Sequence, residues 1–121
     1  MKVLESKIER DACGDALHKL RVPNMKMLHT GGETGWPDRI FFIEGGRPLL
    51  VEFKRPGEKD DTSPRQEYIH SILRELGYDV QVHDNEDEAL EAVRAAKVEA
   101  ARLSKASRKV RSRKAGRRAA T

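Results

Sequence analysis

Two short segments contain the residue types that cleave phosphodiesters. Asp38 lies in Gly35-Trp36-Pro37-Asp38-Arg39, and Glu52 and Lys54 lie in Val51-Glu52-Phe53-Lys54. Two neighbouring carboxylates repel each other, and a hard divalent cation such as Mg²⁺ or Mn²⁺ relieves that repulsion. A lysine beside such a site could orient a water or stabilise developing negative charge. The two segments therefore predict metal-assisted cleavage of a phosphodiester.

A β-hairpin must bring these segments together. The apolar runs 40–43 and 49–53 flank Gly45-Gly46 and predict two buried strands joined by a turn. Residues two apart on a strand share a face, so Glu52 and Lys54 point one way while Phe53 enters the opposite layer.

Asp38 joins Glu52 in only one register of this hairpin. A three-residue loop, Glu44-Gly45-Gly46, pairs Ile43 with Arg47 and Asp38 with Glu52. A two-residue turn would instead point Asp38 away from Glu52. We predict the three-residue loop, because Gly46 can adopt a left-handed conformation without steric cost. A bulge or bend near Pro37 would also bring Asp38 next to Glu52.

The remaining pattern predicts an α/β fold with the order α-β-β-β-α-β-α and a mixed central sheet flanked by helices. Apolar spacing predicts a helix over residues 4–20, a short strand around Met25 and Met27, and a glycine-rich loop over 30–35. Ser63-Pro64 begins a second helix, which Gly77 ends. Its expected inward residues are Ile69, Ile72, Leu73 and Leu76. A strand around Val80 and Val82 follows, and Asp84 or Asn85 caps a last helix.

Composition divides the 121-residue chain into one domain, residues 1–96, and a basic extension, residues 97–121. The extension contains ten lysines and arginines and a single acid, Glu99. We expect it to be helical at first and then disordered, and to bind a polyanion; a merely solubilising tail is the alternative. No apolar run suggests a membrane span or signal peptide, and the lone Cys13 allows no intrachain disulfide, so a cytoplasmic protein is expected.

Four motifs in order resemble the VRR-NUC (virus-type replication-repair nuclease) group of the PD-(D/E)xK, or restriction-endonuclease-like, superfamily. They are Glu5 in the first helix, the Pro37-Asp38 turn, Glu52-Phe53-Lys54, and Ser63-Pro64-Arg65-Gln66. The resemblance covers roughly residues 4–95, and the predicted order of elements agrees with the superfamily core.

The resemblance implies roles for individual residues. Asp38, Glu52 and the main-chain carbonyl of Phe53 would bind the metal, with Lys54 as the catalytic lysine. Gln66 would support the lysine or the attacking water, although Ser63 and Gln66 also form a capping box. Glu5 would be the first-helix metal ligand, with Glu9 as its competitor.

Several residues could contact DNA. Arg39 and Arg55 flank the acids and would either touch phosphates or balance charge, and Trp36 would either stack on a nucleotide or pack under its loop. The extension offers further cations: Lys105, Arg108, Lys109, Arg111, Arg113 and Lys114. The four histidines show no metal-ligand spacing.

Stand-alone members of this group are similar to Holliday junction resolvases, which implies a homodimeric, Mg²⁺- or Mn²⁺-dependent endodeoxyribonuclease acting on branched DNA in repair or recombination. The host would be a bacterial or virus-infected cell. A monomeric flap or nicking endonuclease and a non-catalytic DNA-binding protein are the alternatives.

Overall fold

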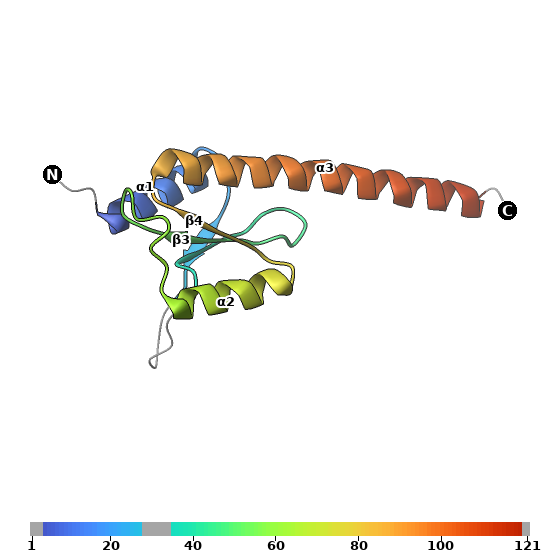
Figure 1. Ribbon diagram of the computed structural model, residues 1–121. Helices are drawn as coiled ribbons and strands as arrows, with labels where there is room; N and C mark the ends of the chain where they lie inside the picture. Colours follow the sequence, from blue (N-terminus) through green and yellow to red (C-terminus); the bar gives the residue numbers. More distant parts are fainter. Residues whose placement is uncertain (1–3, 28–34, 120–121) are drawn as a thin grey trace.

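The computed structural model describes residues 4–27 and 35–119, with side chains described as far as residue 114. His29 and most of the loop predicted over residues 30–35 lie outside the described residues. The elements follow the predicted order (Figure 1). They are α1 (Glu5–His18), β1 (Asn24–Lys26), β2 (Arg39–Phe41), β3 (Leu49–Phe53), α2 (Pro64–Glu75), β4 (Asp79–His83) and α3 (Glu86–Ala119).

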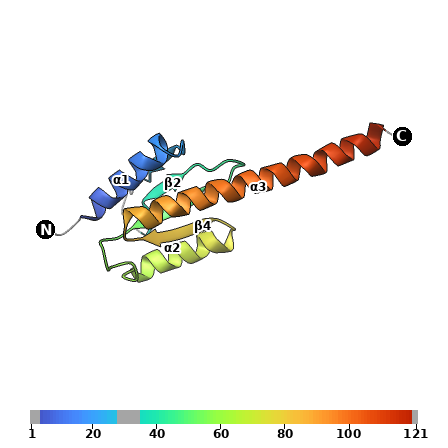
Figure 2. The ribbon, with the colours of Figure 1, turned by 90° about the horizontal axis from the view of Figure 1, so that it is seen from above.

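The strands form one mixed sheet in the order β1-β2-β3-β4. Neighbours are antiparallel except β3 and β4, which run parallel and are connected through α2. α1 and α3 cover one face of this sheet, and α2 covers the other (Figures 1 and 2). The predicted fold class, a mixed sheet flanked by helices, is confirmed.

The hairpin has the predicted register. Arg39 pairs with Val51 and Phe41 with Leu49, which sets Asp38 opposite Glu52 at the end of the ladder. The N–H of Arg47 donates to the carbonyl of Ile43 at 3.4 Å and closes the three-residue loop. Gly45 and Gly46 adopt φ values of 80° and 70°, where a Cβ is disfavoured.

Alternation along β3 assigns its residues to two layers. Leu49, Val51 and Phe53 join the core beneath α1 and α3, which also contains Cys13 and Val93. Leu50 and Glu52 lie at the alternate positions and therefore face α2. The expected separation of Phe53 from Glu52 is confirmed, and it brings Glu52 to the layer that contains Gln66.

The predicted apolar stripes are wrong at several helix positions. Ile72 and Leu76 are 37% and 70% exposed, whereas Ile69 and His70 are buried. α2 therefore packs through residues 66, 69, 70 and 73, so that Ile69 and Leu73 belong to the stripe as predicted, but the polar Gln66 and His70 take the places of Ile72 and Leu76. Leu4 and Leu17 of α1 are also exposed, since α1 packs through Ile8, Ala12, Cys13 and Ala16. Phe42 is exposed too, because β2 ends at Phe41.

The helix α3 crosses the predicted boundary between residues 96 and 97 without a break. Asn85 Oδ1 accepts a hydrogen bond from the N–H of Glu88 at 2.8 Å, which confirms Asn85 as a cap. Ala100 is still buried, and the helix continues to Ala119. The first part of the extension is helical as expected, and the helix is described as far as Ala119, while the expected disorder stays a prediction. Within the described residues, no helix is long and apolar enough to cross a membrane.

Candidate active site

Asp38 and Glu52 meet at the end of the β2–β3 ladder. The main-chain N–H of Phe53 donates a 2.7 Å hydrogen bond to Asp38 Oδ2 and so fixes this carboxylate beside β3. Glu52 is only 4% exposed. The sequence prediction that the two carboxylates come together is confirmed.

The environment of Glu52 disfavours its charge. Burial, followed by the nearby negative charge of Asp38, raises the pKa of Glu52 to about 8, although Lys54 opposes the shift. Among the described residues, no donor reaches the buried Glu52 Oε2. Without a cation, this pair must retain a proton over much of the neutral range.

Gln66 connects the carboxylate pair to the lysine. Its side-chain N–H donates to Glu52 Oε1 at 3.0 Å, while its Oε1 accepts from Lys54 Nζ at 2.9 Å. Gln66 Oε1 also accepts from the N–H of Ser63, and Ser63 Oγ accepts from the N–H of Gln66. The capping box and the contact with the site therefore exist at once, and the start of α2 is locked to the acidic pair.

The competing first-helix acids lie in different surroundings. Partial burial, and then the charge of Asp38, raises the pKa of Glu5, while Lys54 and Arg55 lower it. Glu5 therefore lies within electrostatic reach of the site. Glu9 is buried against other partners, with Arg39 at 3.4 Å and Lys26 at 3.5 Å.

The structure places Arg39 away from the phosphate side of the site. Arg39 pairs with Val51, whose side chain faces α1, and its guanidinium contacts Glu9 there with only 20% of the side chain exposed. It therefore pairs with Glu9, which agrees with the charge-balancing alternative, while a phosphate contact stays a prediction. Arg55 is exposed near Glu5, and Trp36 is half-buried, which leaves both of its roles open.

A contact that the sequence did not reveal holds the Asp38 turn against α2. A Cβ built on Gly35 would lie 2.8 Å from both Cγ and the carbonyl oxygen of Arg65. Gly35 also has a φ of 92°, so any side chain there is strained. The glycine before Trp36-Pro37-Asp38 was the available signal, and it marks where the turn touches the residue before Gln66.

The donor set fits a hard divalent cation in part. Asp38 and Glu52 supply oxygen ligands, and the unsatisfied Glu52 Oε2 needs a positive partner. In the described part of the chain, however, no three His, Cys, Asp or Glu side chains converge on one point. The role of Glu5 as a metal ligand therefore stays a prediction, supported only by its electrostatic proximity to Asp38. Main-chain oxygens, water or the phosphate itself would fill the remaining coordination positions of the cation.

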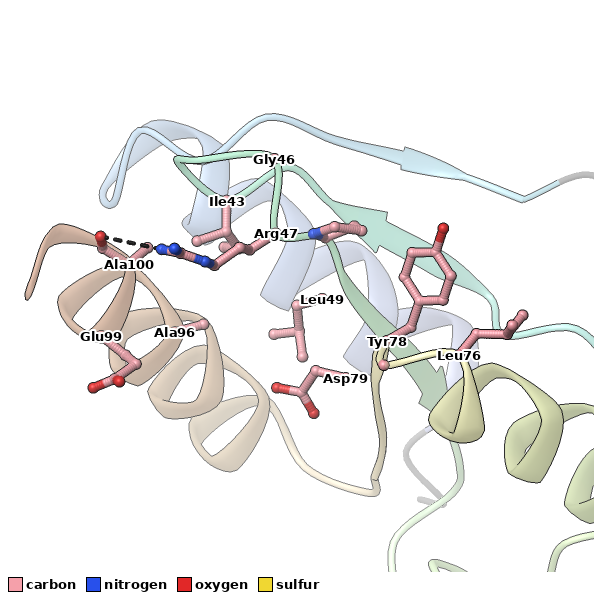
Figure 3. Close-up of a pocket in the computed structure, with 12 residues that line it drawn as sticks. Ile43, Gly46, Arg47, Leu49, Leu76, Tyr78, Asp79, Ala96, Glu99 and Ala100 are labelled. Carbon is pink, nitrogen blue, oxygen red and sulfur yellow. Dashed lines mark hydrogen bonds between the residues drawn. The ribbon is translucent and has the colours of Figure 1, made fainter. Parts of the chain in front are cut away.

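A hollow of about 490 Å³ lies at the other end of the sheet (Figure 3). Leu76 and Tyr78 form one side, and Ala96 and Ala100 form the other. Arg47 crosses it and donates to the carbonyl of Ala100 at 3.4 Å. It contains none of the residues that hold Asp38 and Glu52, so the candidate chemistry does not belong there.

Comparison with known proteins agrees with this site. The structure matches a solved structure described as a VRR_NUC domain, with a TM-score of 0.61 and 20% sequence identity. The match covers 74% of this chain and 94% of that chain. This chain has the VRR_NUC fold. This structural match confirms the resemblance that the sequence motifs predicted.

The amino-acid sequence also matches that of a phage protein. The chain is 41% identical over 56 residues to "Putative nuclease p44" of Acyrthosiphon pisum secondary endosymbiont phage 1. The match covers 46% of this chain and 58% of that protein, so the chain spans little more than half the length of this relative. No family model matches the sequence.

Proposed function

We propose that this protein is a divalent-metal-dependent DNA endonuclease. The observation that carries the proposal is the pair of the half-buried Asp38 and the buried Glu52, joined through Gln66 to Lys54. The VRR_NUC fold and the nuclease name of the phage relative support it.

Each residue of the candidate site would have its own role in cleavage. Asp38 and Glu52 would hold Mg²⁺ or Mn²⁺, together with the main-chain carbonyl of Phe53. When bound, the cation would supply a Lewis acid that activates water and neutralises charge on the phosphate. Gln66 keeps the ammonium of Lys54 next to Glu52, where it would stabilise the negative charge that develops on the phosphate. Glu5 would act through water at the rim of the site.

We further propose branched DNA, and a four-way junction first of all, as the substrate, and a cytoplasmic homodimer as the active form. A four-way junction has two-fold symmetry, so a symmetric dimer would place one site on each of two opposed strands. A monomeric flap or nicking endonuclease is the alternative within the same chemistry.

Cleavage of labelled four-way junction, flap, nicked and linear duplex DNA, with Mg²⁺, Mn²⁺ or EDTA, tests the proposal. We expect metal-dependent cutting that is fastest on the junction. Asp38→Asn should reduce the rate at least about 10²-fold, because the site loses one of two carboxylates. Asp79→Asn, at an exposed position at the start of β4, is the matched control and should leave the rate unchanged.

Other outcomes would replace parts of the proposal. Equal cutting of linear duplex would reject the junction preference, and a monomer that cuts flaps would favour the alternative enzyme. DNA binding without cleavage of any substrate would make the chain a non-catalytic binding protein. Full activity of Asp38→Asn would reject the site.

A further inference from the structure

The basic part of α3 begins where the helix leaves the domain, at the end far from the candidate active site. Glu52 and Lys54 lie at the carboxyl end of β3, and α3 starts just after the parallel neighbour β4 ends. α3 then runs back over the sheet, so that Ala100 meets Arg47 beside the turn that joins β2 and β3. Beyond this point the helix projects away from the domain as a rod (Figures 1 and 2).

All charged side chains on the projecting part of α3 are basic. No acid follows Glu99 in the sequence. Lys105, Arg108 and Lys109 have the i, i+3, i+4 spacing that places side chains on one face of a helix. Together with Ala101 and Ser112 they line a shallow hollow, which we call the arm site.

The cations of the arm site have no counter-charge from the protein. Arg94 and Arg102, earlier on α3, form ion pairs with Glu91 and Glu99. Within the residues that the structure describes, Lys105, Arg108 and Lys109 form none. Three exposed positive charges around the small side chains of Ala101 and Ser112 suit the oxygens of a phosphate backbone.

The absence of aromatic residues distinguishes double-stranded from single-stranded partners. No Phe, Trp or Tyr follows Tyr78 in the sequence. Single-strand binding surfaces rely on aromatic side chains on which bases stack. The arm site can instead recognise only the charge and shape of a phosphate backbone. A stiff DNA duplex presents such a backbone along the straight helix α3.

The length of α3 gives an approximate separation between the arm site and the end of the sheet where Glu52 lies, because α3 begins three residues after His83, the β4 partner of Phe53. With the 1.5 Å rise per residue of an α-helix, Lys105 to Lys109 lie about 28–35 Å along α3 from its first residue, Glu86. A duplex advances about 3.4 Å per base pair, so this distance corresponds to about 8–10 base pairs.

We propose that the arm site binds the phosphate backbone of duplex DNA about one helical turn away from the phosphate that the domain cleaves. The inference rests on the proposed nuclease function and adds a condition to it: tight binding of the substrate, although not its cleavage at saturating concentration, needs a duplex arm of about 10 base pairs or more. The arm therefore selects for DNA length and not for the branch itself.

Binding to junctions whose arms have increasing lengths tests this inference. The full chain is used with Asp38→Asn, so that binding is measured without cleavage. We expect affinity to rise at least about tenfold as arms lengthen from about 6 to about 14 base pairs. The triple variant Lys105→Gln, Arg108→Gln, Lys109→Gln should lose this rise, and its salt dependence should fall by about 2 to 3 in log–log slope. Glutamine preserves helix propensity, which circular dichroism would verify.

A second triple variant, Arg10→Gln, Lys19→Gln, Arg94→Gln, removes equal charge from the domain surface and should keep the rise. An equal loss in this control, or no length dependence in the original chain, would overturn the inference. A change of oligomeric state in the arm variant would also overturn it and would assign the arm to contacts between copies. Cleavage of short-armed junctions tests the nuclease function separately, because the arm site is not needed there.

Discussion

The main-chain N–H of Phe53 donates to the carboxylate of Asp38, so the strand that contains Glu52 also holds the neighbouring acid in place. The backbone thereby forces two carboxylates into a buried space where one unsatisfied oxygen remains. Electrostatic repulsion is built into the fold before any ligand binds. Four predictions follow from the contacts around this pair.

Gln66 should matter for catalysis beyond its role at the helix start. Gln66→Ala removes the bridge between Glu52 and Lys54, and we expect the cleavage rate to fall about 10- to 10²-fold. Ser63→Ala is the matched control, because it removes the cap but leaves the glutamine amide. It should cost about 1 kcal/mol of stability with little loss of rate. Equal rate losses in both variants would reduce Gln66 to a capping residue.

Stability of the metal-free protein should fall at alkaline pH. The pKa of Glu52 is raised from its ordinary value of 4.5 to about 8 in the folded state, so its contribution to stability is full below pH 4.5 and is lost as pH rises through about 8. Glu52→Gln removes this loss and should stabilise the protein at pH 9 by about 0.5–2 kcal/mol. Thermal unfolding in EDTA at pH 6 and pH 9 measures the effect. Glu75→Gln, at an exposed position on α2, should not change the pH dependence.

Gly35 should position the Asp38 turn. Gly35→Ala places a methyl group 2.8 Å from the backbone of Arg65 and forces an unfavourable φ, which should cost about 1–3 kcal/mol. The cleavage rate should fall as well, because the turn is displaced from α2. Gly57→Ala is the control, since Gly57 also has a positive φ but its Cβ would meet no neighbour. A normal cleavage rate in folded Gly35→Ala protein would argue against the positioning role.

The two acids of α1 should separate into a site residue and a structural residue. Glu5→Gln should weaken metal-dependent activity and leave stability nearly unchanged, because Glu5 is only partly buried near Asp38. Glu9→Gln should instead cost about 1–3 kcal/mol, since it leaves Arg39 with a weakened partner. Metal titration of activity, combined with thermal unfolding, distinguishes them. The reverse pattern would make Glu9 the ligand.

The order of elements and the hairpin register could be predicted from sequence, because both depend on local chemistry. Strand alternation fixed the faces of Glu52 and Phe53, and the left-handed preference of glycine selected the loop that pairs Asp38 with Glu52. The capping box of Ser63 and Gln66 is equally local.

Other features depended on contacts between distant segments. The face that α2 buries was decided by its packing on the sheet, which buries the polar His70 although the apolar spacing alone points to Ile72 and Leu76. The sequence left Arg39 with two roles, and only the position of Glu9 on α1, across the sheet layer, showed which acid it pairs with.

The sequence by itself determined which side chains can form the candidate site, since two carboxylates, a lysine and a glutamine occur in the order and spacing that adjacent strands and a helix start require. The tertiary structure alone decided the distances: how deeply Glu52 is buried, and how far the cations of the arm lie from it. Local spacing sets which side chains share a face, but burial and separation arise only when elements pack and a helix extends past its neighbours.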